Sequence, residues 1–148
     1  MIALGGARER RPFLQTRFEE RFPSFSPDGR WIAYVSNESG RSEVYVQPYP
    51  GPGRKWSASG GEGVSPAWGP DGRELYYRSG DVLMAVPVQA HPTFVPGTPR
   101  VLFRRASTTA VAAGPQGRFL VVDARPAGAS SIDVMLNWFT DLKRRITR

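Results

Sequence analysis

The chain has 148 residues, the size of one ordinary domain. Hydrophobic residues make up 40% of it and charged residues 22%, a composition that suits a packed core. It has no cysteine and one histidine, His91, which excludes disulfides, thiolate nucleophiles and cysteine metal sites and argues against His-based triads and metal clusters. The net charge is +7, but the basic residues are spread from Arg8 to Arg148, so we expect no nucleic-acid partner.

The N-terminal part of the chain predicts little structure. No apolar run reaches the roughly 18 residues of a membrane span. Residues 1–8 lack the charge order of a signal peptide, so we expect neither a membrane segment nor a leader. Residues 12–16 predict one outer strand that belongs to a preceding sheet. Over the whole chain, 16 glycines and 14 prolines favour turns and short strands over long helices.

A turn motif occurs three times, and its copies are separated by 43 and 45 residues. Its residues are Pro27, Asp28 and Gly29, then Pro70, Asp71 and Gly72, then Pro115, Gln116 and Gly117. Proline presets the backbone angle, aspartate hydrogen-bonds the backbone ahead, and glycine accepts the left-handed conformation that closes the turn. Strands end before each turn, at Phe25 and Trp68, and begin after it. A period of about 40–45 residues with strand–turn–strand content is typical of four-stranded propeller blades.

Short apolar and β-branched runs predict the other strands of each blade. They lie at residues 43–47, 54–57, 82–88, 100–103 and 132–138. Residues 91–97 predict a proline-rich loop, and residues 139–148 are compatible with a short amphipathic helical turn. The expected fold is all-β: a tail at residues 1–21 with one stray strand, then three antiparallel blades at residues 22–63, 64–106 and 107–148.

The repeat resembles the TolB-type, WD40-like propeller repeat. The residues that carry this resemblance are Phe25 to Tyr34 with Glu43 to Val46, and their second copy around Pro70, Asp71 and Gly72. Residues 12–16 and 134–144 are similar to the last blades of propellers fused to bacterial serine/threonine protein kinases. The resemblance implies a sensing or protein-binding region whose chemistry belongs to another domain. It also implies an extracytoplasmic location if the kinase link holds.

The candidate sites each have a structural alternative. Asp28 and Asp71 are suited to a cation or a basic group of a partner, but aspartate in a turn more often stabilises the turn. Residues 59–63 resemble an anion-binding nest, yet the context favours a connector between blades. The four tryptophans, of which Trp138 is the last, are expected to pack between blades rather than stack on a ligand. Kinase, P-loop and serine-peptidase signatures are missing from the sequence. We therefore predict no catalytic, cofactor-binding or metal-binding residue.

The sequence thus predicts a non-catalytic propeller module that binds an unidentified protein or ligand. The alternatives are a regulatory appendage separated from a kinase, and a truncated reading frame without independent function. The loops at residues 37–42, 79–81 and 124–131 are the expected binding rim.

Three open blades leave two bare sheet faces, where side chains such as Val44, Val46, Leu83 and Val134 are expected to be exposed. We therefore expect the missing blades to come from a longer chain or from self-association, and an isolated chain that is oligomeric, aggregation-prone or loosely folded.

Overall fold

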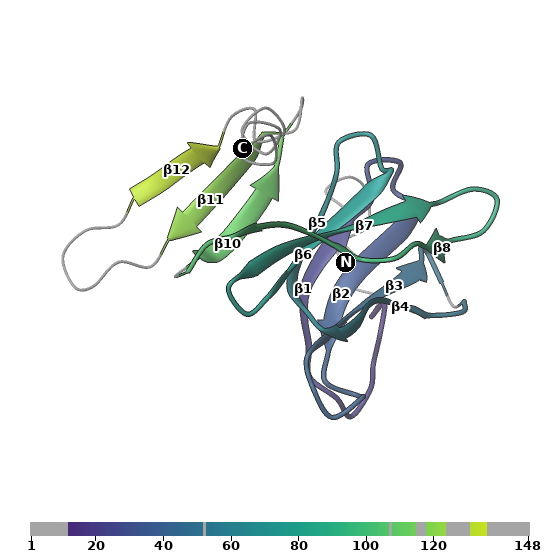
Figure 1. Ribbon diagram of the computed structural model, residues 1–148. Helices are drawn as coiled ribbons and strands as arrows, with labels where there is room; N and C mark the ends of the chain where they lie inside the picture. Colours follow the sequence, from purple (N-terminus) through teal and green to yellow (C-terminus); the bar gives the residue numbers. More distant parts are fainter. Residues whose placement is uncertain (1–11, 52, 107, 115–117, 124–130, 136–148) are drawn as a thin grey trace, which may run out of the picture.

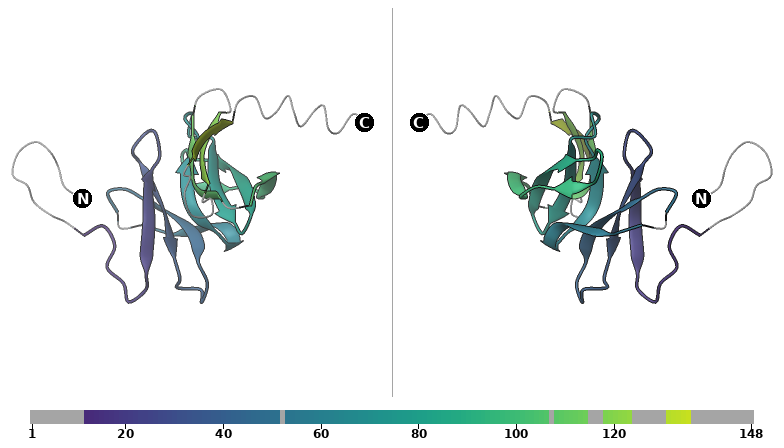
Figure 2. Two further views of the ribbon diagram at one scale, coloured as in Figure 1. Left: turned by 90° about the vertical axis from the view of Figure 1, so that its left-hand side faces the viewer. Right: turned by 90° about the vertical axis from the view of Figure 1, so that its right-hand side faces the viewer.

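The fold is all-β within the part of the chain that the structure describes. The computed structural model describes residues 12–51, 53–106, 108–114, 118–123 and 131–135. These residues form three antiparallel sheets that follow one another along the chain (Figure 1). The first sheet lies beside the second, and the second beside the third (Figure 2). This succession of sheets is an open stack of propeller-type blades.

The first sheet is a four-stranded meander in the order β1-β2-β3-β4. Its strands are β1 (Glu20–Phe25), β2 (Trp31–Ser36), β3 (Glu43–Pro48) and β4 (Trp56–Glu62). The first turn motif joins β1 to β2, because its glycine supplies the positive φ that reverses the chain. Alternate residues of β2 and β3 point to opposite faces, and both faces are buried.

The second sheet repeats this meander and the third follows the same order. The second holds β5 (Val64–Trp68), β6 (Glu74–Ser79), β7 (Val82–Gln89) and β9 (Arg100–Arg104), with the short β8 (Val95–Pro96) paired to the end of β7. The third holds β10 (Thr108–Ala113), β11 (Phe119–Asp123) and β12 (Ser131–Met135). Residues 136–138, the end of the strand predicted in this region, and the C-terminal tail lie outside the described residues.

Large apolar side chains fill the space between the first and second sheets. Trp31, Trp68 and Phe94 lie at the centre of this cluster, together with buried valines and alanines of β2, β3 and β7. Trp56 packs against its edge. The prediction that tryptophans pack between blades is confirmed for these three, whereas Trp138 lies outside the described residues.

A second apolar cluster joins the second sheet to the third. Tyr76, Leu83 and Leu102 of the second sheet contact Phe119 and Val121 of the third. The ring centroids of Tyr76 and Phe119 are 4.9 Å apart in an edge-to-face arrangement. The second sheet therefore buries both of its faces, as the middle member of a stack must.

The outer face of the first sheet is covered by the chain itself. Ile32, Tyr34 and Tyr45 are buried there under Phe13, Leu14 and Tyr49. The strand predicted at residues 12–16 is not formed. Phe13 and Leu14 lie over a sheet face instead of pairing with a sheet edge, so they form no ladder.

Two further expectations are wrong. Val44 and Val46 were expected on a bare face but are fully buried between the first and second sheets, and Leu83 is buried against the third. Their strands direct them inward, so the stack buries them. The expected connector at residues 59–63 is largely strand, because β4 runs to Glu62 and pairs it with Glu43 across a bulge.

Candidate functional site

The two described turn motifs are held by their own hydrogen bonds. Asp28 Oδ1 accepts from the Ser26 hydroxyl at 2.6 Å and from the Arg30 amide at 3.1 Å. Asp71 Oδ1 accepts from the Arg73 amide at 3.0 Å. The intervening glycines take φ of 70° and 69°, as the turn requires. The Ser26 hydrogen bond is the largest cause that holds the pKa of Asp28 below its usual value. Each carboxylate therefore serves its own turn.

His91 brings the loop after β7 against the first turn. Its Nε2 lies 3.5 Å from Asp28 Oδ2, and Arg30 Nη1 lies 3.1 Å from Nδ1 and 3.0 Å from Nε2. All three groups are exposed, so their electrostatic interaction is weak. Beside them, residues of both turns and of the segment 88–91 line a pocket of about 480 Å³. The arrangement links the first and second sheets without forming a recognisable catalytic constellation.

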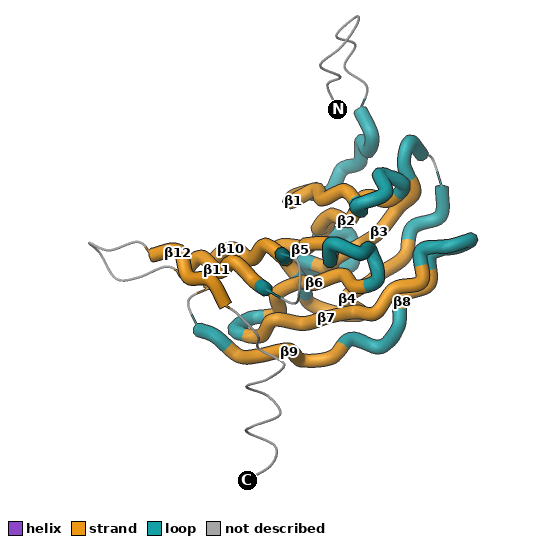
Figure 3. The backbone as a smooth tube through the Cα atoms, turned by 90° about the horizontal axis from the view of Figure 1, so that it is seen from above, coloured by secondary structure: helices purple, strands orange, loops and turns teal. Residues whose placement is uncertain are grey.

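The first strands of the three sheets lie next to one another. β5 contacts β1 on one side and β10 on the other, and Figure 3 shows the three strands together, away from β9 on the far edge of the second sheet. Each of these strands carries a register irregularity, after Arg21, Val64 and Thr108 respectively. In a propeller, the first strands of successive blades line the central channel.

The bulges in β1 and β5 share an uncommon backbone conformation. Phe22 has φ of 53° and Ser65 has φ of 54°, and each is followed by a proline, Pro23 or Pro66. A positive φ is costly for a residue with a side chain, by roughly 1 kcal/mol or more. The two positions are 43 residues apart, the interval of the turn repeat. The irregularity is thus part of the repeated unit.

A groove of about 510 Å³ runs over these strands. Its lining consists of uncharged residues from all three sheets: Phe22, Pro23, Ser24, Phe25, Pro27, Ser65, Pro66, Ala67, Trp68, Val111, Ala112 and Ala113. Phe22 is 52% exposed and Phe25 is 46% exposed, although both are large apolar side chains. The Trp68 indole is turned away from solvent and donates to the Ser24 carbonyl oxygen at 3.1 Å. The groove offers apolar and aromatic contact area to a ligand.

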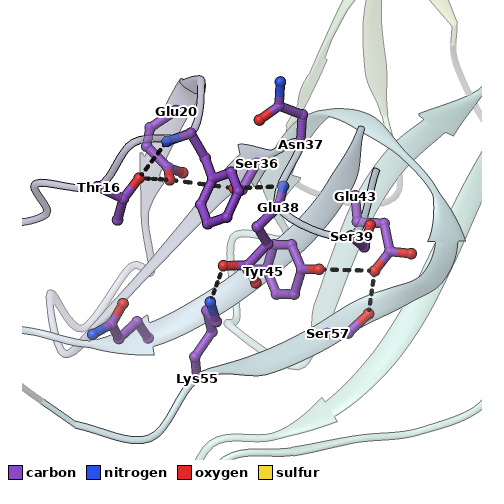
Figure 4. Close-up of polar contacts among 12 residues, drawn as sticks. Thr16, Glu20, Ser36, Asn37, Glu38, Ser39, Glu43, Tyr45, Lys55 and Ser57 are labelled. Atoms are coloured by element: carbon purple, nitrogen blue, oxygen red, sulfur yellow. Dashed lines mark hydrogen bonds and ion pairs between the residues drawn. The ribbon is translucent and has the colours of Figure 1, made fainter. Parts of the chain in front are cut away.

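A polar network covers one end of the first sheet (Figure 4). Glu20 Oε1 accepts from the hydroxyls of Thr16 at 2.8 Å and Ser36 at 3.2 Å, and Lys55 pairs with Glu38. Further along, Glu43 accepts from Arg41 Nε at 2.9 Å and from the Tyr45 hydroxyl at 3.1 Å.

Burial acts to raise the pKa of Glu43, but hydrogen bonds from Arg41 and Tyr45 outweigh it and lower the pKa below its usual value. Burial, with the Glu43 carboxylate beside it, raises the pKa of Tyr45 to about 12. At neutral pH Glu43 is therefore ionised and Tyr45 neutral. Each serves as a structural partner of the other.

The groove differs from the sites that the sequence singled out. It includes Pro27 of the turn motif, but none of its lining residues comes from the loops at residues 37–42 and 79–81. The third turn at residues 115–117 and the loop at residues 124–130 lie outside the described residues. Sequence reasoning missed Phe22 and Phe25. The signal available was the recurrence of a proline four residues before the proline of the turn motif, at Pro23 and Pro66.

The described residues include no group of three or more His, Cys, Asp or Glu side chains placed to hold a metal ion. Among the same residues, no helix is long and apolar enough to cross a membrane.

Comparison with known proteins finds similarity to TolB. No family model matches the chain. The Tol-Pal system protein TolB of Hydrogenovibrio crunogenus (strain DSM 25203 / XCL-2) is 43% identical over 44 residues, which make up 30% of this chain and 10% of that protein. The crystal structure of TolB from Acinetobacter baumannii aligns with 83% of this chain and 42% of that chain, at 18% identity and a TM-score of 0.44. The chain thus spans about a tenth of the curated relative that it matches, and the sequence similarity is to a TolB protein over one short segment.

Proposed function

We propose that this chain is a non-catalytic propeller-type module that binds an apolar, uncharged segment of a protein partner in the groove over β1, β5 and β10. The observation that carries the proposal is the exposure of Phe22 and Phe25 in a groove whose lining has no charged side chain. Exposed large aromatic side chains in a concave, apolar surface are typical of binding sites.

The geometry of the groove supports a peptide-like ligand. Its lining comes from three successive sheets, so an extended ligand contacts all three at once. The strained backbone at Phe22 and Ser65 holds the lining in one arrangement, and strain of this kind clusters at ligand clamps. A charged ligand segment would lose its hydration there without gaining a partner.

A binding selection tests this proposal. A displayed library of short peptides, sorted on the purified chain, is expected to return uncharged sequences rich in apolar residues. Replacing Phe25 by Asp should weaken the binding of the selected peptide by roughly 30-fold, the effect of losing an aromatic hot spot. Val101→Asp is the matched control, because Val101 is similarly exposed, at 53% against 46% for Phe25, but does not line the groove. Selection of charged peptides, or equal binding by the Phe25 variant, would contradict the proposal.

The absence of catalysis is part of the same proposal. Purified chain is expected to show no phosphotransferase or peptidase turnover. Activity that follows the protein through purification and disappears in a point variant would refute this. The kinase link and an extracytoplasmic location rest only on the resemblance of residues 12–16 and 134–144. DNA upstream of Met1 that encodes further repeats and a kinase in frame would support the link, and a stop codon there would favour the independent module.

A further inference from the structure

The segment that covers the outer face of the first sheet is held loosely. We call residues 13–19 the strap. The Phe18 amide donates to the Thr16 hydroxyl at 3.0 Å and the Glu19 amide to Asn37 Oδ1 at 3.0 Å. These backbone groups are thus bonded to side chains and not to a neighbouring strand. A strap attached in this way separates from the sheet without breaking a β-ladder.

The fit between the strap and the sheet is incomplete. A cavity of about 190 Å³ lies between Phe13 and Leu14 of the strap and Ile32 and Tyr34 of the sheet. At its rim, Glu20 Oε2 is buried without a hydrogen-bond partner among the described residues. A void deprives its lining of dispersion contacts, and an unsatisfied buried acceptor is costly. Between sheets of this chain, by contrast, Val44, Val46 and Leu75 are fully buried.

The opposite end of the stack presents an apolar face. Phe119 and Val121 point toward the second sheet, so Leu120 between them points away, and it is 40% exposed. The strand register pairs Leu120 with Ala112, which is also exposed. The third sheet therefore offers apolar side chains on its outer side.

We propose that the strap is displaceable, and that the face beneath it binds the third sheet of a second copy of the chain. Both sheet interfaces within the chain already join consecutive blades face to face, so this contact continues an existing mode of packing. If the third sheet of each copy packs on the first sheet of the other, the contact is head-to-tail and closes after two copies. The resulting ring has six blades, within the usual range of four to eight.

Sedimentation analysis of the full chain over a concentration series tests this inference. The wild-type chain is expected to equilibrate between monomer and dimer. Replacing both Phe13 and Leu14 by Ala weakens the strap, so the dimer dissociation constant should fall by roughly tenfold or more. Adding Leu120→Glu should restore the monomer. Val101→Glu is the matched control, because Val101 is exposed on a strand of the second sheet and so belongs neither to the outer face of the first sheet nor to that of the third.

Each alternative result overturns the inference. An unchanged or raised dissociation constant in the double variant means that the strap does not compete with a second copy. Loss of the folded state in that variant, read by circular dichroism, means that the strap is an integral part of the fold. A dimer that survives Leu120→Glu excludes the third sheet as the occupant. Growth into open filaments excludes the closed pair.

Discussion

Phe94 is the side chain whose removal should damage the fold most. It lies in the segment between β7 and β8 and is fully buried between the first and second sheets. Its ring centroid is 5.3 Å from that of Trp31, 5.6 Å from Trp56 and 6.2 Å from Trp68. Phe94→Ala removes these three contacts and leaves a cavity among rigid rings that cannot close around it.

The expected loss of unfolding free energy is about 4 kcal/mol. Truncation of a buried phenylalanine to alanine costs about 3–5 kcal/mol. Each aromatic pair adds roughly 0.5–1.5 kcal/mol beyond the buried area, which places this site in the upper half of that range. A domain is stable by about 5–15 kcal/mol in total, so this one substitution should remove roughly a quarter or more of the stability.

Urea unfolding followed by tryptophan fluorescence measures this loss, because Trp31, Trp56 and Trp68 report directly on the cluster. Phe22→Ala is the matched control, because it removes the same atoms from a side chain that is 52% exposed. Alanine, like phenylalanine, carries a Cβ, so the cost of the positive φ at this position is unchanged. The control should lose less than about 1 kcal/mol. A Phe94→Ala chain that loses no more than the Phe22→Ala chain would show that the cluster does not hold the two sheets together.

Gly29→Val should cost about 1–2 kcal/mol, because φ of 70° opposes a side chain even though the space around it is open. Gly61→Val, with open space and no positive φ, should cost less in the same urea assay, and equal costs would contradict the conformational explanation. Gly63→Ala should cost roughly 1–3 kcal/mol, because its Cβ would lie 2.9 Å from side chains of β4 and β6; unchanged stability would mean that these strands move apart freely. The hydrogen bond from Ser26 lowers the pKa of Asp28 below its ordinary 3.8, so its stabilising contribution is present above that pH and is lost as the pH falls through the lower folded value. Asp28→Asn should therefore make the free energy of unfolding fall less steeply as the pH is lowered. A fall as steep as that of the wild type would refute the role of Asp28 in the acid sensitivity.

The turns were predictable because their chemistry is local. Proline, aspartate and glycine act on the backbone within four residues, so the motif placed the β1–β2 and β5–β6 hairpins without knowledge of the rest of the chain. The predicted strands after each turn, from Trp31 and from Leu75, lie within β2 and β6. The apolar runs were enough to place these strands because each strand is short and, apart from β9, pairs with a neighbour in sequence.

The remaining features depend on contacts between distant residues. Phe94 sits in a proline-rich stretch that reads as an exposed loop, and only the approach of three tryptophans buries it. Residues 59–63 are rich in glycine, yet β4 continues because the Ser59 hydroxyl accepts the Val44 amide at the bulge, at 3.0 Å. The groove depends on strands separated by about one repeat each. The recurring prolines Pro23 and Pro66 mark the place in the repeat, but only the packing of the three sheets shows that Phe22 and Phe25 stay exposed there.

The inner edges of the first two sheets are protected against the addition of another strand. β1 and β5 each have one unpaired edge, the kind of surface on which chains aggregate. Pro23 and Pro66 remove an amide donor at the same place in each strand, and the adjacent bulges break the regular spacing of hydrogen-bonding groups. The Trp68 indole also occupies the Ser24 carbonyl oxygen. Amyloid-like growth from these two inner edges is thereby disfavoured, so the strands that line the groove present side chains to a ligand without presenting a regular row of free backbone groups.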